Sequence, residues 1–281
     1  MPGEVAAYYA RGDLLARLEA ALREDGADPA APSLEALAAY DQFHGRGIEA
    51  TEELATRLAA EPAHHLLDVG SGLGGPARVF ARRFGCRVSG IDLTAEFCAL
   101  ARELNRRTGL EARVSIHEGD ALAMPFADAT FDGAYSMNVS MNIADKAGLW
   151  HELRRVLKPG GWLVLSELAR GTGPAPEYPL PWAETPATSF LATPDETRLG
   201  LESAGFEVLE CLDQTARNEA YAARARAALK AGAKHPHRAI ALVHGDRARA
   251  VMANSAHGVS QGRLVPIEVF ARRRARPAVA G

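Results

Sequence analysis

Cysteine is scarce in this sequence, and its placement excludes two common kinds of site. The only cysteines among the 281 residues are Cys86, Cys98 and Cys211, and no two of them form a C-x-x-C pair. Three scattered thiols are too few for a disulfide framework or a zinc site. We therefore expect reduced thiols, a protein of the cytoplasm, and no bound metal.

An excess of charge of one sign and long apolar runs are also missing. The chain has 32 basic and 35 acidic side chains and a formal net charge of −3, which gives no electrostatic reason to expect a nucleic acid partner. No segment reaches the roughly 18 consecutive apolar residues that a membrane span requires. The N-terminal segment is charged and lacks a continuous apolar core, so we expect no signal peptide. The length permits one large domain with a lid, or two small domains.

From His64 onward, short apolar runs alternate with segments of helical periodicity. The expected strands are HHLLDVG, CRVSGID, ARVSIHEGD, FDGAYSMNV and WLVLSEL. Helices of about ten to fifteen residues separate several of them, and glycines such as Gly85 and Gly109 stand where these helices should end. This alternation predicts an α/β fold with a parallel sheet covered by helices on both faces.

The segments outside this alternation differ in composition and in apolar spacing. Residues 1–60 contain helical spacing but no strand, so we expect an N-terminal helical cover over a core domain of residues 61–281. Residues 170–194 hold six prolines and three aromatic residues, which favours an ordered lid over a disordered linker. The remaining expected elements are a helix over 195–204, the strand GFEVLECL, helices over 215–231 and 238–256, and the strand RLVPIEVFARR.

The glycine-rich stretch LLDVGSGLGGPARVF, residues 66–80, leaves two ligands open. Gly70, Gly72 and Gly75 satisfy the G-x-G-x-x-G fingerprint of a dinucleotide-binding turn, and they fit equally well the turn that wraps S-adenosyl-methionine. Asp68 precedes the first of these glycines by two residues. Its negative charge would repel a pyrophosphate and attract the ammonium group of a methionine moiety. The position of Asp68 therefore favours the methyl donor.

Other polar residues stand at the ends of the expected strands. Asp92 lies 24 residues after Asp68, about the interval at which such folds place an acid on the ribose hydroxyls. Asp120 and Ala121 stand at the end of ARVSIHEGD and could read an adenine ring, and Asn138 stands near the end of FDGAYSMNV. Ligands of open parallel sheets bind at the carboxyl ends of the strands. A turn or capping role is the alternative for each acid.

The series LLDVGSGLGG, GIDLT, GDALAMPFADATFDGAYSMNV and VLKPGGWLVLSE resembles the motifs of class I S-adenosyl-methionine-dependent methyltransferases. Among these, the sequence is most similar to small-molecule enzymes of the ubiquinone/menaquinone-biosynthesis and sarcosine/dimethylglycine types. The resemblance implies a Rossmann-like, doubly wound seven-stranded sheet whose last strand is antiparallel, with S-adenosyl-methionine as cofactor. The residues it implies for cofactor binding are Asp68, Gly70, Ser71, Gly72 and Gly74 at the methionine end, Asp92 and Leu93 at the ribose, Asp120 and Ala121 at the adenine, and Asn138 near the sulfonium.

The resemblance implies transfer of a methyl group to a small-molecule acceptor through an N or C nucleophile, with S-adenosyl-homocysteine as product. Such a displacement mainly needs alignment and exclusion of water, and a base only where the acceptor arrives protonated. We consider His44, whose ordinary pKa suits proton acceptance, Asn138, and Glu167, which could pair with a cationic acceptor, as catalytic candidates. Related sequences often carry Gln followed by His or Asp where Met137 and Asn138 stand.

Three alternatives stay open at this point. The first is an O-methyltransferase of a small phenol or quinone, and the second is a catalytically silent S-adenosyl-methionine-binding protein. The third is a dinucleotide reductase. The clustered carboxylates of metal-dependent catechol-type enzymes do not appear between Asp132 and Asp145. The sequence names neither the acceptor nor the oligomeric state.

Overall fold

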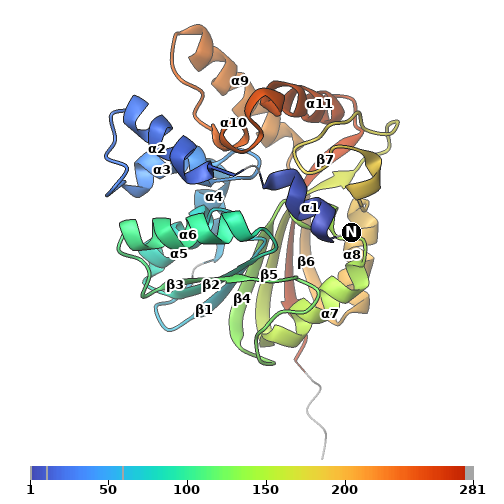
Figure 1. The fold of residues 1–281 in the computed structure, drawn as a ribbon. Coiled ribbons are helices and arrows are strands. Elements are labelled where there is room, and N and C mark those ends of the chain that lie inside the picture. Colours follow the sequence, from blue (N-terminus) through green and yellow to red (C-terminus); the bar gives the residue numbers. More distant parts are fainter. Residues whose placement is uncertain (1, 11, 59, 276–281) are drawn as a thin grey trace, which may run out of the picture.

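A seven-stranded mixed sheet forms the centre of the computed structural model, which describes residues 2–10, 12–58 and 60–275 (Figure 1). The strands run in the order β3-β2-β1-β4-β5-β7-β6. Neighbours among β1 to β5 pair in parallel, whereas β7 is antiparallel to both β5 and β6. The expected fold class is therefore confirmed, including the antiparallel last strand. The strands are β1 (His65–Val69), β2 (Arg87–Asp92), β3 (Val114–Glu118), β4 (Phe131–Met137), β5 (Leu157–Arg170), β6 (Phe206–Asp213) and β7 (Leu264–Arg273).

Successive residues of β1 supply the two faces of the sheet, because side chains alternate along a strand. Leu66 belongs to an apolar cluster with helices α4 (Ile48–Leu58), α5 (Gly75–Phe84) and α6 (Ala95–Arg107). Leu67 belongs to the opposite cluster, with α7 (Lys146–Val156) and α8 (Pro194–Ser203). The central strands β1 and β4 are buried on both faces, which explains their continuous apolar runs.

A third group of helices covers the carboxyl edge of the sheet. It combines α1 (Pro2–Tyr9), α2 (Leu14–Glu24) and α3 (Leu34–Asp41) with α9 (Thr215–Lys230), α10 (Ala239–His244) and α11 (Ala248–Ser260) from the other end of the chain. Figure 1 shows these blue and orange-red helices together above the sheet. The leucines of α2 at positions 14, 18 and 22 are buried in one cluster with residues of α6 and α10. The two ends of the chain therefore build one cover.

The division at residue 60 stays a prediction. Helix α4, which falls in the N-terminal part, shares its cluster with β1, so the proposed boundary crosses a continuous core. Residues 1, 11, 59 and 276–281 fall within the two ranges and lie outside the described residues.

The segment between β5 and α8 is an ordered wall that contains one short 3₁₀ turn, η2 (Pro186–Thr188). Asn142 Nδ2 donates to Trp182 O at 2.7 Å, and Asn254 Nδ2 donates to Pro179 O at 3.0 Å. Leu180 and Trp182 are buried against Met141. These contacts hold the segment over the carboxyl ends of β4 and β5.

One expected helix is wrong. Residues 238–256 form two helices, α10 and α11, separated by a 3₁₀ turn, η3 (Gly245–Arg247). Gly245 has φ 55° and ψ −127°, a conformation that is essentially restricted to glycine. The chain therefore turns at Gly245 instead of continuing the helix. Across the described ranges, no helix combines the length and apolar character of a membrane crossing.

Candidate functional site

The turn after β1 has glycine at every second position from 70 to 74, so its backbone is accessible at the carboxyl edge of the sheet. Gly70, Gly72 and Gly74 have φ values of 70°, 52° and 76°, the left-handed region that glycine tolerates best. A Cβ on Gly70 would lie 2.2 Å from Val139 Cγ2, whereas a Cβ on Gly72 would meet no described heavy atom within 4 Å. Close packing therefore requires glycine at position 70, and the backbone at position 72 borders open space.

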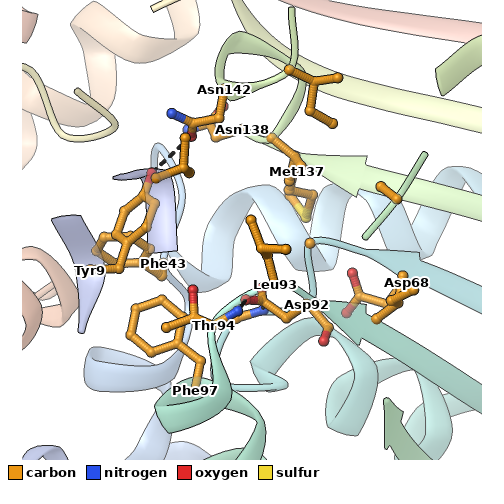
Figure 2. Close-up of a pocket in the computed structure, with 18 of the residues that line it drawn as sticks. Tyr9, Phe43, Asp68, Asp92, Leu93, Thr94, Phe97, Met137, Asn138 and Asn142 are labelled. Atoms are coloured by element: carbon orange, nitrogen blue, oxygen red, sulfur yellow. Dashed lines mark hydrogen bonds between the residues drawn. The ribbon is translucent and has the colours of Figure 1, made fainter. Parts of the chain in front are cut away.

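That open space belongs to a cavity of about 360 Å³ at the carboxyl ends of β1, β2 and β4 (Figure 2), which we name the donor pocket after the role that we propose for it. The sheet order reverses between β1 and β4, which is where α/β sheets bind ligands. Gly74 and Glu167, the two remaining predicted site residues, do not line this pocket. The predicted site residues that line it are His44, Asp68, Gly70, Ser71, Gly72, Asp92, Leu93, Asp120, Ala121 and Asn138.

Asp68 lines the donor pocket, and one of its carboxyl oxygens, Oδ2, lacks a hydrogen-bond partner among the described residues. Its side chain is buried. Burial, together with the neighbouring Asp92 carboxylate, raises the pKa of Asp68 to about 8, and the adjacent Tyr135 hydroxyl opposes that shift. A buried carboxylate of this kind is costly without a cationic or hydrogen-bonding partner. The site therefore fits the ammonium group of a bound amino acid moiety.

Asp92 connects the turns after β1 and β2. Its Oδ2 accepts from Gly72 N at 2.8 Å and its Oδ1 accepts from Thr94 N at 2.8 Å. Burial raises the pKa of Asp92, and these two backbone donors oppose that shift. Each carboxylate oxygen can accept a further bond, so the pair of oxygens remains suited to two ribose hydroxyls. Asp120 makes a similar local bond, from Leu122 N to Oδ1 at 2.9 Å.

Asn138 joins the end of β4 to the N-terminal segment. Its backbone has φ 59°, an uncommon conformation that Asn tolerates better than most residues. In the amide orientation that satisfies both neighbours, its nitrogen donates to Ser166 O at 3.1 Å and its oxygen accepts from Gly45 N at 3.2 Å. Asn138 is therefore held firmly at the rim of the donor pocket.

Glu167 of β5 accepts hydrogen bonds from the backbone of the loop after β4. It is buried, and it accepts from Val139 N and Ser140 N at 3.2 Å. Burial raises its pKa to about 7, against the effect of these donors and of the Lys146 ammonium. The carboxylate thus fixes the backbone beside Asn138. Its predicted catalytic role stays a prediction.

His44 lines the donor pocket but is already hydrogen-bonded through both ring nitrogens. Nε2 lies 3.0 Å from Thr51 Oγ1 and 3.4 Å from Gln42 Oε1, and Nδ1 lies 3.2 Å from Gly45 O. Burial lowers the pKa of His44 to about 3, so the ring is neutral near pH 7. Its predicted role as a base stays a prediction, and it would require the ring to exchange one of these partners for the acceptor.

Two aromatic residues of the donor pocket were missed from the sequence. The rings of Tyr9, Phe97 and Phe43 meet edge to face or tilted, with centroids 5.7–6.1 Å apart. Figure 2 shows these rings facing the pocket across from Asp68. The Tyr9 hydroxyl donates to Asn142 Oδ1 at 3.0 Å. Phe97 is in the helix that follows Asp92, which is a weak signal. Tyr9 reaches the site from α1, and no motif marks it.

A second cavity of about 760 Å³ adjoins the donor pocket. Tyr9, Phe43, His44 and Asn138 line both spaces. The far walls of the second cavity come from α9, α11, β7 and the segment before α8, which contributes Trp182. The two spaces therefore meet at one wall of four residues, over the end of β4.

Residues 67–165, which contain most of the donor pocket, match the family described as Methyltransferase domain. This segment belongs to a methyltransferase domain, and the sheet around it has the Rossmann-like methyltransferase fold. In this methyltransferase domain, the described residues contain no group of three or more His, Cys, Asp and Glu side chains arranged to hold a metal ion.

The names of curated relatives describe methylation at carbon and at oxygen. The chain is 39% identical over 169 residues to 24-methylenesterol C-methyltransferase 2 of Oryza sativa subsp. japonica, covering 58% of this chain and 46% of that protein. It is 31% identical over 164 residues to an O-methyltransferase of Pyrenophora dematioidea, covering 58% and 61%. The chain thus spans about half to three fifths of the length of these relatives.

Solved structures share the fold at lower identity. Geranyl diphosphate C-methyltransferase from Streptomyces coelicolor A3(2), in complex with S-adenosyl-L-homocysteine, aligns with TM-score 0.66 and 21% identity, over 80% of this chain and 77% of that one. The [4+2]-cyclase SpnF aligns with TM-score 0.65 and 23% identity, over 92% and 93%. At these identities the likeness establishes the fold of the methyltransferase domain alone.

Proposed function

We propose that this chain is an enzyme that transfers the S-methyl group of S-adenosyl-methionine to an N or C nucleophile of a small-molecule acceptor. The observation that carries the proposal is the meeting of the two cavities at Tyr9, Phe43, His44 and Asn138. An in-line displacement needs donor and nucleophile on opposite sides of one methyl group. Two adjacent spaces that share one wall supply this arrangement.

The donor-binding roles follow from the chemistry of the pocket. Asp68 would hold the ammonium group, Asp92 with Leu93 the ribose, and Asp120 with Ala121 the adenine, while Gly70, Ser71, Gly72 and Gly74 shape the turn beneath the methionine moiety. When bound, the sulfonium supplies an already activated methyl group. The side chains of this chain therefore need only to bind, orient and exclude water. The product is S-adenosyl-homocysteine.

Two of the residues at the wall shared by the two cavities carry no charge. His44 is neutral near pH 7, and Asn138 is held between Ser166 O and Gly45 N. An alkene carbon or an unprotonated amine needs no proton removed before it attacks, which supports the N or C acceptor. The three free cysteines support placing this activity in the cytoplasm.

O-methylation is the second candidate, because relatives named O-methyltransferases are 31% identical to this chain. A phenol or other hydroxyl acceptor would need a base. Glu167, whose pKa is about 7 and which lines the second cavity, is the carboxylate closest in character to that task.

The test is transfer of labelled methyl from S-adenosyl-methionine by the purified full chain to panels of amines, alkenes, carbon acids and phenols. We expect S-adenosyl-homocysteine to accumulate with an amine or an alkene. Asp68→Asn should weaken donor binding, and Asp132→Asn is the matched control, because Asp132 lies at the opposite end of β4 and pairs with Lys158. Binding without transfer to any acceptor class would indicate a silent binding protein, and calorimetric binding of NADH without the sulfonium would overturn the donor site.

A further inference from the structure

The second cavity contains two buried polar side chains, Gln214 and Glu268, away from the wall it shares with the donor pocket. Gln214 precedes α9, and Glu268 lies on β7. Both line the cavity and each is only 6% exposed. Gln214 Nε2 donates to Glu268 Oε2 at 3.1 Å. Two polar groups therefore stand together in a cavity whose other walls include Trp182, Ile240 and Val259.

Gln214 Oε1 is a buried hydrogen-bond acceptor that receives no hydrogen bond from the described residues. The bond from Nε2 to Glu268 fixes which end of the amide is oxygen. A buried acceptor left unsatisfied costs about 1–3 kcal/mol, and such exceptions in a native fold call for an explanation. Because Gln214 lines the cavity, a donor carried by a ligand can satisfy this oxygen.

The charges around Gln214 and Glu268 decide which ligand group can donate a hydrogen bond to Gln214 Oε1. Glu268 Oε2 lies 3.2 Å from Arg57 Nη1, and Arg57 Nη2 also pairs with Glu210 at 2.6 Å. Glu268 therefore already has a cationic partner, and an ammonium group is not required. Burial raises the pKa of Glu268, and the Arg57, Arg46 and Arg217 cations oppose that shift. Arg46, a buried cation of the cavity wall, pairs with Glu53 at 2.9 Å. A phosphate beside Gln214 and Glu268 would therefore face a carboxylate and a carbonyl oxygen, and the remaining arginine of the cavity wall, Arg226, is exposed. A neutral hydroxyl fits these two groups.

The sheet sets the distance from this pair to the site of transfer. Asn138 follows β4 and Gln214 follows β6, and the intervening order is β4-β5-β7-β6. Three steps between strands, each of about 4.8 Å, separate these strand ends by about 14 Å. An acceptor that reaches both must be elongated.

We propose that the acceptor is an elongated, largely apolar molecule with a free hydroxyl group about 14 Å from the atom that is methylated, and that this hydroxyl donates to Gln214 Oε1. The inference rests on the proposed function in one respect, that the second cavity holds the acceptor. The hydroxyl takes no part in the methyl transfer. It anchors the end of the acceptor remote from the donor pocket.

The experiment compares ligands that share one chain and differ at one end. Binding of 1-dodecanol, 1-methoxydodecane, dodecylamine and dodecyl phosphate to the full chain is measured by calorimetry in the presence of S-adenosyl-homocysteine. We expect 1-dodecanol to bind about tenfold more tightly than the ether, and more tightly than the amine and the phosphate. Gln214→Leu should abolish the preference of the alcohol over the ether. Asn218→Leu, a change of another polar residue of the cavity wall one turn along α9, should retain it.

Equal binding of alcohol and ether by the unchanged protein would overturn the inference, as would preferred binding of the phosphate or the amine, or failure of all four ligands to bind. These outcomes need no variant, so they hold even where Gln214→Leu does not fold. Persistence of the preference in a folded Gln214→Leu protein would overturn it as well. The proposed function fails separately, if S-adenosyl-homocysteine does not bind or no methyl group is transferred while the alcohol preference remains.

Discussion

At the residue scale, the proposed donor-binding role of Asp68 is coupled to folding. Its ordinary pKa is 3.8, and burial raises it to about 8 in the folded protein. Because the folded pKa is raised, the contribution of Asp68 to the free energy of unfolding is fully present below about pH 4 and is lost as the pH rises through 8. Without a ligand the buried carboxylate is therefore a destabilising group at high pH. An ammonium partner reverses this effect.

Asp68→Asn is expected to weaken binding of S-adenosyl-homocysteine about 10- to 100-fold at pH 8, the range of a hydrogen bond to a charged group. In the unchanged protein, affinity should fall as the pH is lowered from about 8 to about 6, by up to tenfold per pH unit, because Asp68 must lose its proton to pair with the ammonium group. The variant should show no such slope. Calorimetry across this pH range measures both effects.

The unliganded variant provides the control for a folding defect. Since Asn carries no charge to bury, Asp68→Asn without ligand should melt at the same or a higher temperature than the unchanged protein at pH 8. A lower melting temperature together with unchanged ligand affinity would show that Asp68 has a structural role only.

At the element scale, the outcome for residues 238–256 shows where local patterns fail. The segment has helical composition throughout except Gly245, and a single glycine is tolerated within many helices. What ends α10 here is packing: His244 is buried, and its Nε2 lies 3.0 Å from Pro181 O in the segment before α8. A contact across 63 residues of sequence decides the turn, and no local pattern contains it.

The site divides in the same way. Asp68, Asp92, Asp120 and Asn138 were predictable as pocket residues, because parallel strands bring their carboxyl ends to one edge. Each of the four lies within two residues of such an end. Tyr9 was not predictable, since it reaches the donor pocket from a helix with no fixed relation to the sheet. The second cavity was beyond sequence reasoning for the same reason, as helices distant in the chain form its walls.

Gly245→Ala is expected to lower the free energy of unfolding by about 1–3 kcal/mol, because alanine is strained at φ 55° and ψ −127°. Denaturant titration measures the loss. Gly3→Ala is the matched control: Gly3 lies in α1, its backbone is not left-handed, and an added Cβ would meet no described atom within 4 Å. That variant should be neutral or slightly more stable. Equal effects of the two substitutions would mean that the turn at Gly245 adapts without strain.

At the scale of the whole molecule, one buried ion pair joins the N-terminal cover to the sheet domain. Arg78 of α5 lies 2.9 Å from Asp41 of α3, and both are almost fully buried. Arg78 also donates to Asn105 Oδ1 at 2.8 Å and to Leu73 O at 2.6 Å. A Cβ on Gly75 would lie 2.3 Å from Asp41 O. The cover therefore packs directly on the turn that forms the donor pocket, so loss of this pair should affect both stability and donor binding.

Arg78→Met is expected to lower the free energy of unfolding by about 3–5 kcal/mol, because it leaves the Asp41 carboxylate buried without a cation. The double variant Asp41→Leu/Arg78→Met should recover most of that loss, since a buried pair replaced by apolar residues is often neutral. Arg170→Met, which breaks an exposed pair with Glu196, should cost no more than about 1 kcal/mol. Denaturant midpoints with and without S-adenosyl-homocysteine measure all three. If Arg78→Met costs no more than Arg170→Met, or if the double variant recovers nothing, then the cover is held to the sheet by its apolar contacts instead of by this pair.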